Sequence, residues 1–173
     1  MTAHLWPLLR LKGSSGDELK EKYREIFVET YVKTSCGDKI IIKDWNDNRI
    51  HFSLGMFDHA FSEASNYRFS YGVHDISFSY KRAYRILWIK ETLSASAGTI
   101  ERRHQMKRDG RGRLRKRRTL IVVEEKYVVV LEETDKGKEL NFISAFPADS
   151  FYLEKIRQES TLVEIKNPSL NGD

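Results

Sequence analysis

Cysteine is almost absent from this 173-residue sequence, which contains only Cys36. A single cysteine excludes an internal disulfide framework and a zinc site of the CxxC type, and it is typical of a reducing compartment. The surrounding run, KTSCGDK, is typical of the end of a helix, so we do not expect a nucleophilic thiol at this position.

Long apolar runs are also missing. No stretch approaches the ~20 apolar residues of a membrane-spanning helix. The first residues, MTAHLWPLLRLKGSSG, include a short apolar patch but neither a basic n-region nor a small-residue cleavage site, so we expect no signal peptide. We therefore expect a cytoplasmic protein without membrane contact, in which residues 1–16 form a flexible arm.

The sequence carries only weak signals for a phosphate-binding loop or a metal-binding site. The run GRGR at 110–113 lacks both the strand–loop–helix setting and the Lys-Ser/Thr pair of a nucleotide-binding loop. His59 and Glu63 with His74 and Asp75 suggest a metal site, but no carboxylate-rich cluster lies nearby in the sequence. Metal-dependent nuclease chemistry is therefore disfavoured, and we expect no cofactor.

One segment carries all of the excess positive charge. Residues 102–118, RRHQMKRDGRGRLRKRR, hold ten Lys or Arg and one acid, whereas the remaining 156 residues hold 20 Lys or Arg and 24 Asp or Glu. Such asymmetry indicates contact with a polyanion, most often phosphate. The candidate nucleic-acid ligands are Arg102, Arg103, Lys107, Arg108, Arg111, Arg113, Arg115, Lys116, Arg117 and Arg118.

The same segment has other interpretations. Charge runs are usually solvated, so it is also consistent with a flexible loop that aids solubility, and a nuclear-localisation signal has a similar composition. Because the segment interrupts a folded region, we favour a substrate-facing connector between sheet strands that becomes fully ordered only when phosphate binds.

The first half of the chain predicts helices and a hairpin. Ser15 and Glu18 match a capping box, and apolar residues then follow at helical spacing to a stop near Gly37. The run 39–53 predicts two strands around a polar Asn-Asp-Asn turn. Further helices are predicted at 56–64 and 78–93.

The second half predicts a sheet. Strands are expected at 99–106, 116–124, 126–133 and 138–146, followed by a short helix in DSFYLEKIRQ and a loose tail at 164–173. The whole order predicts a single α+β domain, residues 1–173. N-terminal helices would pack on one face of a mainly antiparallel four-stranded sheet, with a short C-terminal helix.

His59 is the most informative of the five histidines. It borders the apolar stripe of the helix predicted at 56–64, where an imidazole reaches both a sheet edge and solvent. This position suits a general acid or base whose pKa stays near neutral. A structural histidine that bridges helix and hairpin explains the position equally well.

A metal-free basic domain with a well-placed histidine favours RNA over DNA as a substrate. RNA carries its own nucleophile, the 2′-hydroxyl, so cleavage needs a base, an acid and cations that stabilise the phosphorane charge. DNA lacks this hydroxyl and normally requires a metal or a covalent enzyme nucleophile.

Three runs resemble a known family. FDHAFSEASNY, FSYKRAYRILWIKETL and VVVLEETDKGKELNFISAFPAD, with a basic strand pair between the second and third, resemble the phage-associated branch of the barnase/EndoU/colicin/RelE-like (BECR-fold) nucleases over residues 38–160. The resemblance implies helices packed on a four-stranded antiparallel sheet and metal-independent endoribonuclease activity, often in a toxin or host–phage conflict role. An inhibitor or antitoxin protein is a separate candidate partner. The long basic insertion at 102–118 departs from the family pattern.

The resemblance also implies roles for particular residues. His59 would be the helix-borne histidine and Ser144 the hydroxyl of the last core strand, with Arg82, Arg103 and Arg118 as phosphate ligands. By strand alternation, however, Ser144 shares a side with Leu140, Phe142 and Phe146, where a small hydroxyl is more often a packing residue.

Tyr127 is the last catalytic candidate, after His59, Ser144 and Arg82. It opens the neighbouring strand and offers a phenol beside the scissile phosphate, or it is an ordinary cross-strand aromatic.

Three functions are therefore open. The first is a toxin-like endoribonuclease that acts on tRNA, mRNA or rRNA. The second is a non-catalytic RNA- or DNA-binding module. The third is a protein whose basic segment pairs with an acidic partner, such as an antitoxin or a ribosomal surface.

Overall fold

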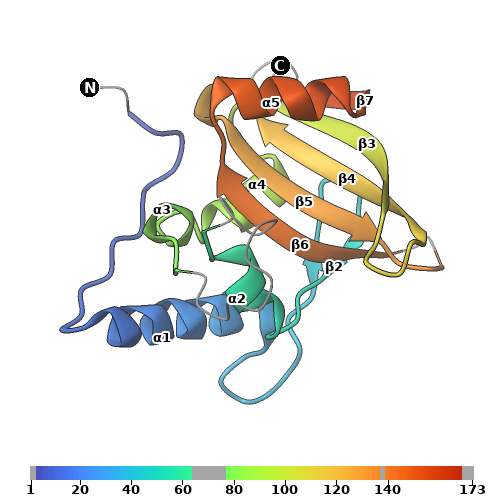
Figure 1. Ribbon diagram of the computed structural model, residues 1–173. Coiled ribbons are helices and arrows are strands. Elements are labelled where there is room, and N and C mark those ends of the chain that lie inside the picture. The colour runs from blue at the N-terminus through green and yellow to red at the C-terminus, as the bar shows by residue number, and fades with distance from the viewer. Residues whose placement is uncertain (1–2, 64–76, 137–138, 169–173) are drawn as a thin grey trace.

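The computed structural model describes residues 3–63, 77–136 and 139–168, which fold into one mixed, curled sheet with helices on both faces (Figure 1). The strands are β1 (Ile42–Lys43), β2 (Arg49–His51), β3 (Ile100–Arg108), β4 (Leu114–Val122), β5 (Tyr127–Glu133), β6 (Glu139–Pro147) and β7 (Thr161–Lys166). The helices are α1 (Gly16–Phe27), α2 (Met56–Ala60), α3 (Tyr80–Ala83), α4 (Trp88–Ser94) and α5 (Ser150–Gln158), with a π-helical turn η1 (Val28–Val32) and a 3₁₀ turn η2 (Val123–Glu125). None of these described helices is long and apolar enough to cross a membrane.

The expectation of a four-stranded antiparallel sheet is wrong. Seven strands pair in the order β1-β2-β6-β5-β4-β3-β7, and β2 pairs with β6 in parallel, with Ile50 opposite Leu140. The expected meander of β3 to β6 is present at its centre. The hairpin predicted at 39–53 also forms, but its pairing with β6 is a tertiary contact that no local pattern encodes. In β7 no side chain is fully buried, so its sequence carries no alternating apolar signal.

The start of α1 follows the sequence closely. The Glu18 N–H donates to Ser15 Oγ at 3.2 Å, as expected of an N-cap. The Glu18 carboxylate accepts from the Ser14 N–H at 2.6 Å, one residue earlier than in a standard capping box. The helix passes into η1 and ends at Val32, five residues before Gly37.

The helix predicted at 78–93 is interrupted between α3 and α4 by the Tyr31 hydroxyl. This hydroxyl donates to the Ile86 carbonyl at 2.6 Å and accepts from the Lys90 N–H at 3.1 Å. It therefore occupies the place of the helical hydrogen bond between Ile86 and Lys90. Insertion of a side chain into the backbone ladder is a recognised cause of helix breaks.

Two other groups from distant parts of the sequence donate hydrogen bonds to backbone carbonyls in the same interruption. The Leu9 N–H donates to the Tyr84 carbonyl at 2.8 Å, and the Tyr127 hydroxyl donates to the Arg85 carbonyl at 3.3 Å. Since these partners lie far away in the sequence, the local helical pattern of 78–93 does not reveal the break.

The sheet has two faces. On the core face, the rings of Tyr31, Phe52 and Phe142 stack, with centroids 4.6 Å and 4.8 Å apart, and join η1 to β6. On the opposite face, α5 lies across one end of the strands (Figure 1), and its Leu153 packs against Ile121 and Val128. We call this second surface the α5 face.

Both termini of the described chain contact this framework. In the segment predicted as a flexible arm, Trp6 is buried and its Nε1 donates to Ser96 Oγ at 2.9 Å. The Leu5 N–H donates to the Glu125 carboxylate at 2.7 Å. Residues 164–166 of the predicted loose tail belong to β7, which pairs with β3.

Glu164 joins the two ends of the sheet. Its carboxylate accepts from Trp45 Nε1 and Asn46 Nδ2, both at 3.1 Å, and forms an ion pair with Arg102 at 3.1 Å. Trp45 and Asn46 belong to the β1–β2 turn, whereas Glu164 is in β7. The contact therefore holds the sheet in its curled shape.

We expect Glu164→Ala to lower the free energy of unfolding by about 1–3 kcal/mol. The substitution leaves the half-buried Arg102 without its ion-pair partner and removes the acceptor of the hydrogen bonds from Trp45 and Asn46. Urea unfolding followed by circular dichroism measures the change. Glu25→Ala, on the exposed side of α1, is the control and should change stability by less than about 0.5 kcal/mol. Equal effects of the two variants would contradict the closing role of Glu164.

Candidate active site

The candidate site depends on a bulge in β6. Val130 pairs with Ser144 and Leu131 with Phe142, so Ile143 has no partner in β5. Across this extra residue the alternation reverses, and Phe142 lies in the main core whereas Ser144 and Phe146 lie on the α5 face. The prediction that Ser144 shares a side with Leu140 and Phe142 is therefore wrong.

Arg82 links two helices to the bulged strand. Its Nη1 donates to the Ala60 carbonyl at the end of α2 at 3.0 Å and lies 3.5 Å from Ser144 Oγ. Its Cζ lies 5.0 Å from the centroid of the Phe146 ring. Burial lowers the pKa of Arg82 from its ordinary value, partly opposed by the charge of Glu63. A guanidinium nevertheless stays protonated in proteins, so a positive charge lies beside the Ser144 hydroxyl.

His59 lies in the last turn of α2, next to the carbonyl that Arg82 caps, and its side chain is exposed. Partial desolvation, and then the positive charges of Arg82 and Arg117, lower its pKa from the ordinary value. Because the pKa is lowered, the imidazole of the free protein is mostly neutral at neutral pH and can accept a proton.

The pairing of His59 with Glu63 on one helix is wrong. α2 ends at Ala60, and Ser62 forms an isolated β-bridge with Phe78, so Glu63 lies beyond the helix. His74 and Asp75 lie outside the described residues. Among the residues that the structure describes, no three His, Cys, Asp or Glu side chains form a group able to hold a metal ion.

The α5 face continues from Ser144 across the sheet. One row of paired residues consists of Ser144, Val130, Thr119 and Arg103. The next row, farther from α5, consists of Asn141, Glu132, Arg117 and Gln105. Arg117 Nε lies 3.6 Å from the Glu132 carboxylate, so this guanidinium is partly neutralised.

Arg103 lies on the same face but is fully used in holding the fold. It is 9% exposed, and its guanidinium donates to Ser160 Oγ and Glu101 Oε1, both at 2.8 Å, and to the Arg157 carbonyl at 3.1 Å. These bonds fasten β3 to the end of α5. Arg103 is therefore not available as the phosphate ligand that the sequence suggested.

The basic segment 102–118 forms strands. β3 and β4 pair from Ile100–Val122 to Arg108–Leu114, with a tight turn at 109–113 held by the Asp109 carboxylate. The expectation of a connector that becomes ordered only on phosphate binding is therefore wrong. Cross-strand partners supply the order, because carboxylates from elsewhere in the chain lie beside the basic side chains.

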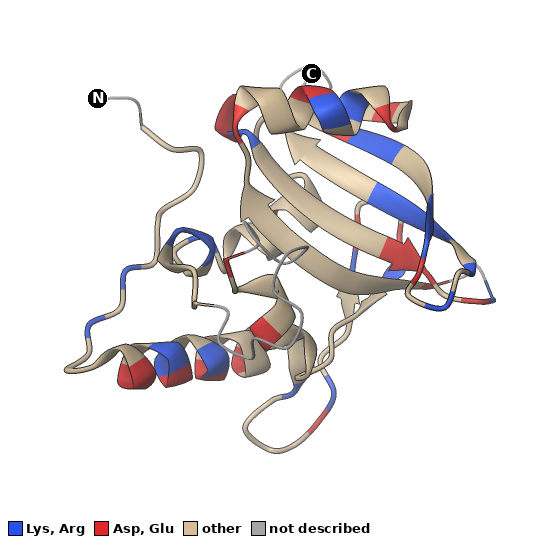
Figure 2. Cartoon of the chain, viewed as in Figure 1, with Lys and Arg blue, Asp and Glu red and all other residues tan. Residues whose placement is uncertain are grey.

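Five carboxylates from outside the segment pair with it. They belong to Glu101, Glu132, Glu133, Asp135 and Glu164. Figure 2 shows the basic bands of β3 and β4 beside the acidic end of β5. Because most of these acids are distant in the sequence, the charge count of the segment overstates the positive field that a phosphate would meet.

The remaining basic candidates differ in their partners. Ion pairs hold Arg102, Arg113, Arg115, Lys116 and Arg118. Near the hairpin turn, Lys107, Arg108 and Arg111 are exposed, and Arg108 donates to the Gly112 carbonyl at 2.7 Å. An incoming polyanion can therefore reach these three residues, and it can also reach the exposed side chain of Arg113 if its ion pair with Asp109 opens.

Tyr127 is buried on the core face, although its phenol interacts electrostatically with Arg82. Its side chain is 1% exposed on the core face, its ring packs edge-on to Trp88, and its hydroxyl binds the Arg85 carbonyl. Burial raises the pKa of this phenol far above its ordinary value. A buried phenol of this kind does not reach a phosphate in solvent, so the candidate site omits Tyr127.

Two aromatic residues of the α5 face were not identified from the sequence. The Phe146 ring lies between Arg82 and Tyr152, and its centroid is 5.7 Å from that of Tyr152. Tyr152 is 44% exposed. The adjacent pair Phe151–Tyr152 in a short helix indicates that at least one ring is exposed, but only the position of α5 relative to β6 identifies which ring adjoins Arg82.

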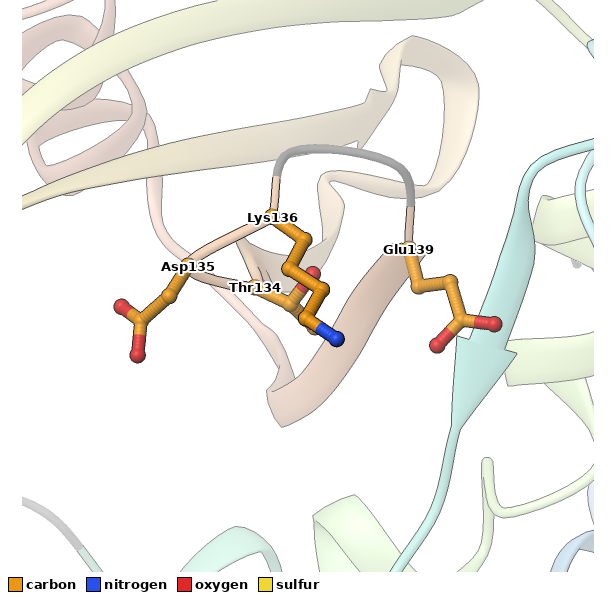
Figure 3. Close-up of a pocket in the computed structure, with 4 residues that line it drawn as sticks. All are labelled: Thr134, Asp135, Lys136 and Glu139. Carbon is orange, nitrogen blue, oxygen red and sulfur yellow. The ribbon is translucent and has the colours of Figure 1, made fainter.

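A depression of about 490 Å³ lies elsewhere, at the turn between β5 and β6 (Figure 3). It is lined by Thr134, Asp135, Lys136 and Glu139. Two of these four residues are acidic, and none of them belongs to the group around His59. We therefore take the candidate site to be the group around Arg82. It consists of Arg82, Ser144 and Arg117 on the α5 face, and His59 at the end of α2, on which the charges of Arg82 and Arg117 act.

Comparison with known proteins gives no relative. No family model, curated protein or solved structure matches the chain. The nuclease resemblance of the three sequence runs therefore stays an interpretation, and the function proposed below rests on the geometry of the α5 face.

We expect the pKa of His59, measured by NMR titration of its ring protons, to lie below the ordinary value of about 6.5. Arg117→Gln should raise this pKa, because removal of a nearby positive charge makes the imidazolium less unfavourable. Arg111→Gln, at the exposed hairpin turn, should leave it unchanged. An unchanged pKa in Arg117→Gln would show that the two side chains do not interact.

Proposed function

We propose that the protein is a metal-independent endoribonuclease of the toxin-like kind that acts in the cytoplasm. The observation that carries the proposal is the position of His59, an exposed histidine one residue before the Ala60 carbonyl that the Arg82 guanidinium binds. The charges of Arg82 and Arg117 act on its imidazole and help to lower its pKa, and Arg82 also lies 3.5 Å from the Ser144 hydroxyl. These are the groups that RNA cleavage by the 2′-hydroxyl requires.

In the proposed reaction, His59 acts as the general base. Its neutral imidazole takes the proton of the ribose 2′-hydroxyl, and the 2′-oxygen forms a bond to the adjacent phosphorus. The bond from phosphorus to the 5′-oxygen breaks, and that oxygen takes a proton from the imidazolium or from water. The products are a 2′,3′-cyclic phosphate and a 5′-hydroxyl. RNA supplies the nucleophile, so the reaction requires no metal.

Arg82 is the proposed phosphate ligand. Its guanidinium is held by the Ala60 carbonyl and by the Phe146 ring, so it is oriented before substrate arrives. Preorganised cations stabilise the phosphorane charge more effectively than mobile ones. Ser144 is only 8% exposed, so we propose that its hydroxyl orients the Arg82 guanidinium. Arg117, partly neutralised by Glu132, adds a weaker positive charge that acts on His59. An inhibitor or antitoxin protein is a proposed partner.

We expect purified protein to cleave total RNA in EDTA and to leave 2′,3′-cyclic phosphate ends. His59→Ala should lower the rate by about 10²–10⁴-fold, the usual contribution of a general base, while RNA binding is retained. The rate should increase with pH through the pKa of His59 and level off above it, because only the neutral imidazole takes a proton.

His4→Ala is the matched control. His4 is an exposed histidine of the N-terminal segment that contacts the Glu125 carboxylate, and it does not belong to the candidate site. It should cleave like the original protein. Intact RNA at every pH, or equal cleavage by His59→Ala, would rule out the proposed chemistry.

A second candidate function is non-catalytic RNA binding, favoured by the exposed basic residues at the β3–β4 turn. The ion-paired residues deeper in the hairpin contribute less to this binding, because a phosphate would have to displace their carboxylates.

For RNA binding, Arg108 and Arg111 should matter more than Arg118. Replacing the first two by alanine should lower the slope of log affinity against log salt by about one for each phosphate that is no longer bound. Arg118→Gln, whose partner Glu133 lies at 2.7 Å, should change the slope much less. Fluorescence anisotropy with labelled RNA in the His59→Ala background measures both. Equal changes in slope would show that the ion pairs open freely.

A further inference from the structure

The Tyr152 ring is an exposed aromatic surface next to the proposed phosphate ligand. It is 44% exposed in the first turn of α5 and contacts Phe146 edge-on at 5.7 Å. Phe146 in turn packs against the guanidinium of Arg82 at 5.0 Å. Tyr152 is therefore only two contacts away from Arg82, on the same face of the sheet.

The position of Tyr152 is held from several sides. The Tyr152 N–H donates to the Asp149 side chain at 2.7 Å, which caps α5. Leu153, the next residue, is 3% exposed and packs on Ile121 and Val128. The backbone that carries the ring is therefore rigid while much of the ring stays open to solvent.

Contact between water and an exposed aromatic ring is unfavourable, and the free energy falls when another flat apolar surface covers the ring. Nucleobases are such surfaces, and proteins that bind single-stranded nucleic acid combine stacked aromatic rings with cations that hold the phosphates. On the α5 face, the aromatic pair Phe146–Tyr152 and the Arg82 guanidinium lie in this arrangement, and Ser144 Oγ is 3.5 Å from the same guanidinium.

We propose that Tyr152, supported by Phe146, stacks on an unpaired nucleobase whose phosphate binds Arg82, and that the substrate of this site is single-stranded RNA. The inference rests on the proposed ribonuclease function for its substrate class. In a duplex both faces of each base are covered by its neighbours, so the ring cannot stack without extrusion of the base.

The experiment measures binding of the full-length protein to a short 2′-O-methyl RNA, which lacks the nucleophile and is not cleaved. The labelled strand is used alone and as a duplex with its complement. Tyr152→Ala should weaken single-strand binding about 5- to 100-fold, the range for loss of one base–aromatic stack. It should leave the duplex affinity, which is weaker in the original protein, unchanged.

Three further variants separate stacking from other effects. Tyr152→Phe keeps the ring and should bind like the original protein. Tyr152→Leu keeps an apolar contact for Phe146 without a ring, and it should lose as much affinity as Tyr152→Ala. Phe151→Ala removes a neighbouring ring that is 83% exposed, and it should change nothing.

The proposal is overturned if Tyr152→Ala and Tyr152→Leu bind the single strand normally, or if single strand and duplex lose affinity equally. An equal loss of single-strand affinity in Phe151→Ala would indicate that exposed rings bind RNA non-specifically, and this result would also overturn the proposal. Because binding is scored without cleavage, the two proposals fail separately. If the Tyr152 variants lose single-strand affinity but the protein does not cleave RNA, only the ribonuclease proposal is rejected. If the protein cleaves RNA but the Tyr152 variants bind normally, only the stacking proposal is rejected.

Discussion

A single unpaired residue in β6 determines on which side of the sheet the candidate site forms. Without the bulge at Ile143, strict alternation from Phe142 would turn Ser144 into the core beside the stacked rings. With it, Ser144 and Phe146 turn toward Arg82 on the α5 face. Bulges are common beside functional sites because they re-aim a side chain at little cost to the rest of the ladder.

The second requirement is the interrupted helix. Arg82 lies in α3, and α3 ends where Tyr31, Tyr127 and Leu9 take the backbone carbonyls of the following turn. Tyr31 and Tyr127 are also buried in the core, so the packing of the core and the orientation of Arg82 are coupled. Buried residues far from His59 thus contribute to the site without touching it.

Local patterns in the sequence identified the meander β3–β6, the N-cap at Ser15, the hairpin at 39–53 and the closing helix α5. The helical pattern also pointed to His59, and the family resemblance to Arg82, and the roles of both residues stay predictions. Strand alternation placed Ser144 on the wrong side, because a bulge leaves no mark on the apolar pattern. The local patterns also treated residues 102–118 as free charge, since Glu133 and Glu164 meet Arg118 and Arg102 only after the sheet forms. Pairing between distant segments explains each of these differences.

The contacts of Glu164 also bear on whether two molecules of this protein can associate through the edge strand β7. β7 is the last strand in the sheet order, and its Leu162, Val163 and Ile165 are exposed, a combination that normally invites a strand from another molecule. A register shift in its pairing with β3 distorts this strand, and the β1–β2 turn is tied to it by Trp45 and Asn46. A register irregularity and a covering turn are features that normally hinder edge-to-edge pairing, and in this sheet both lie at the exposed strand.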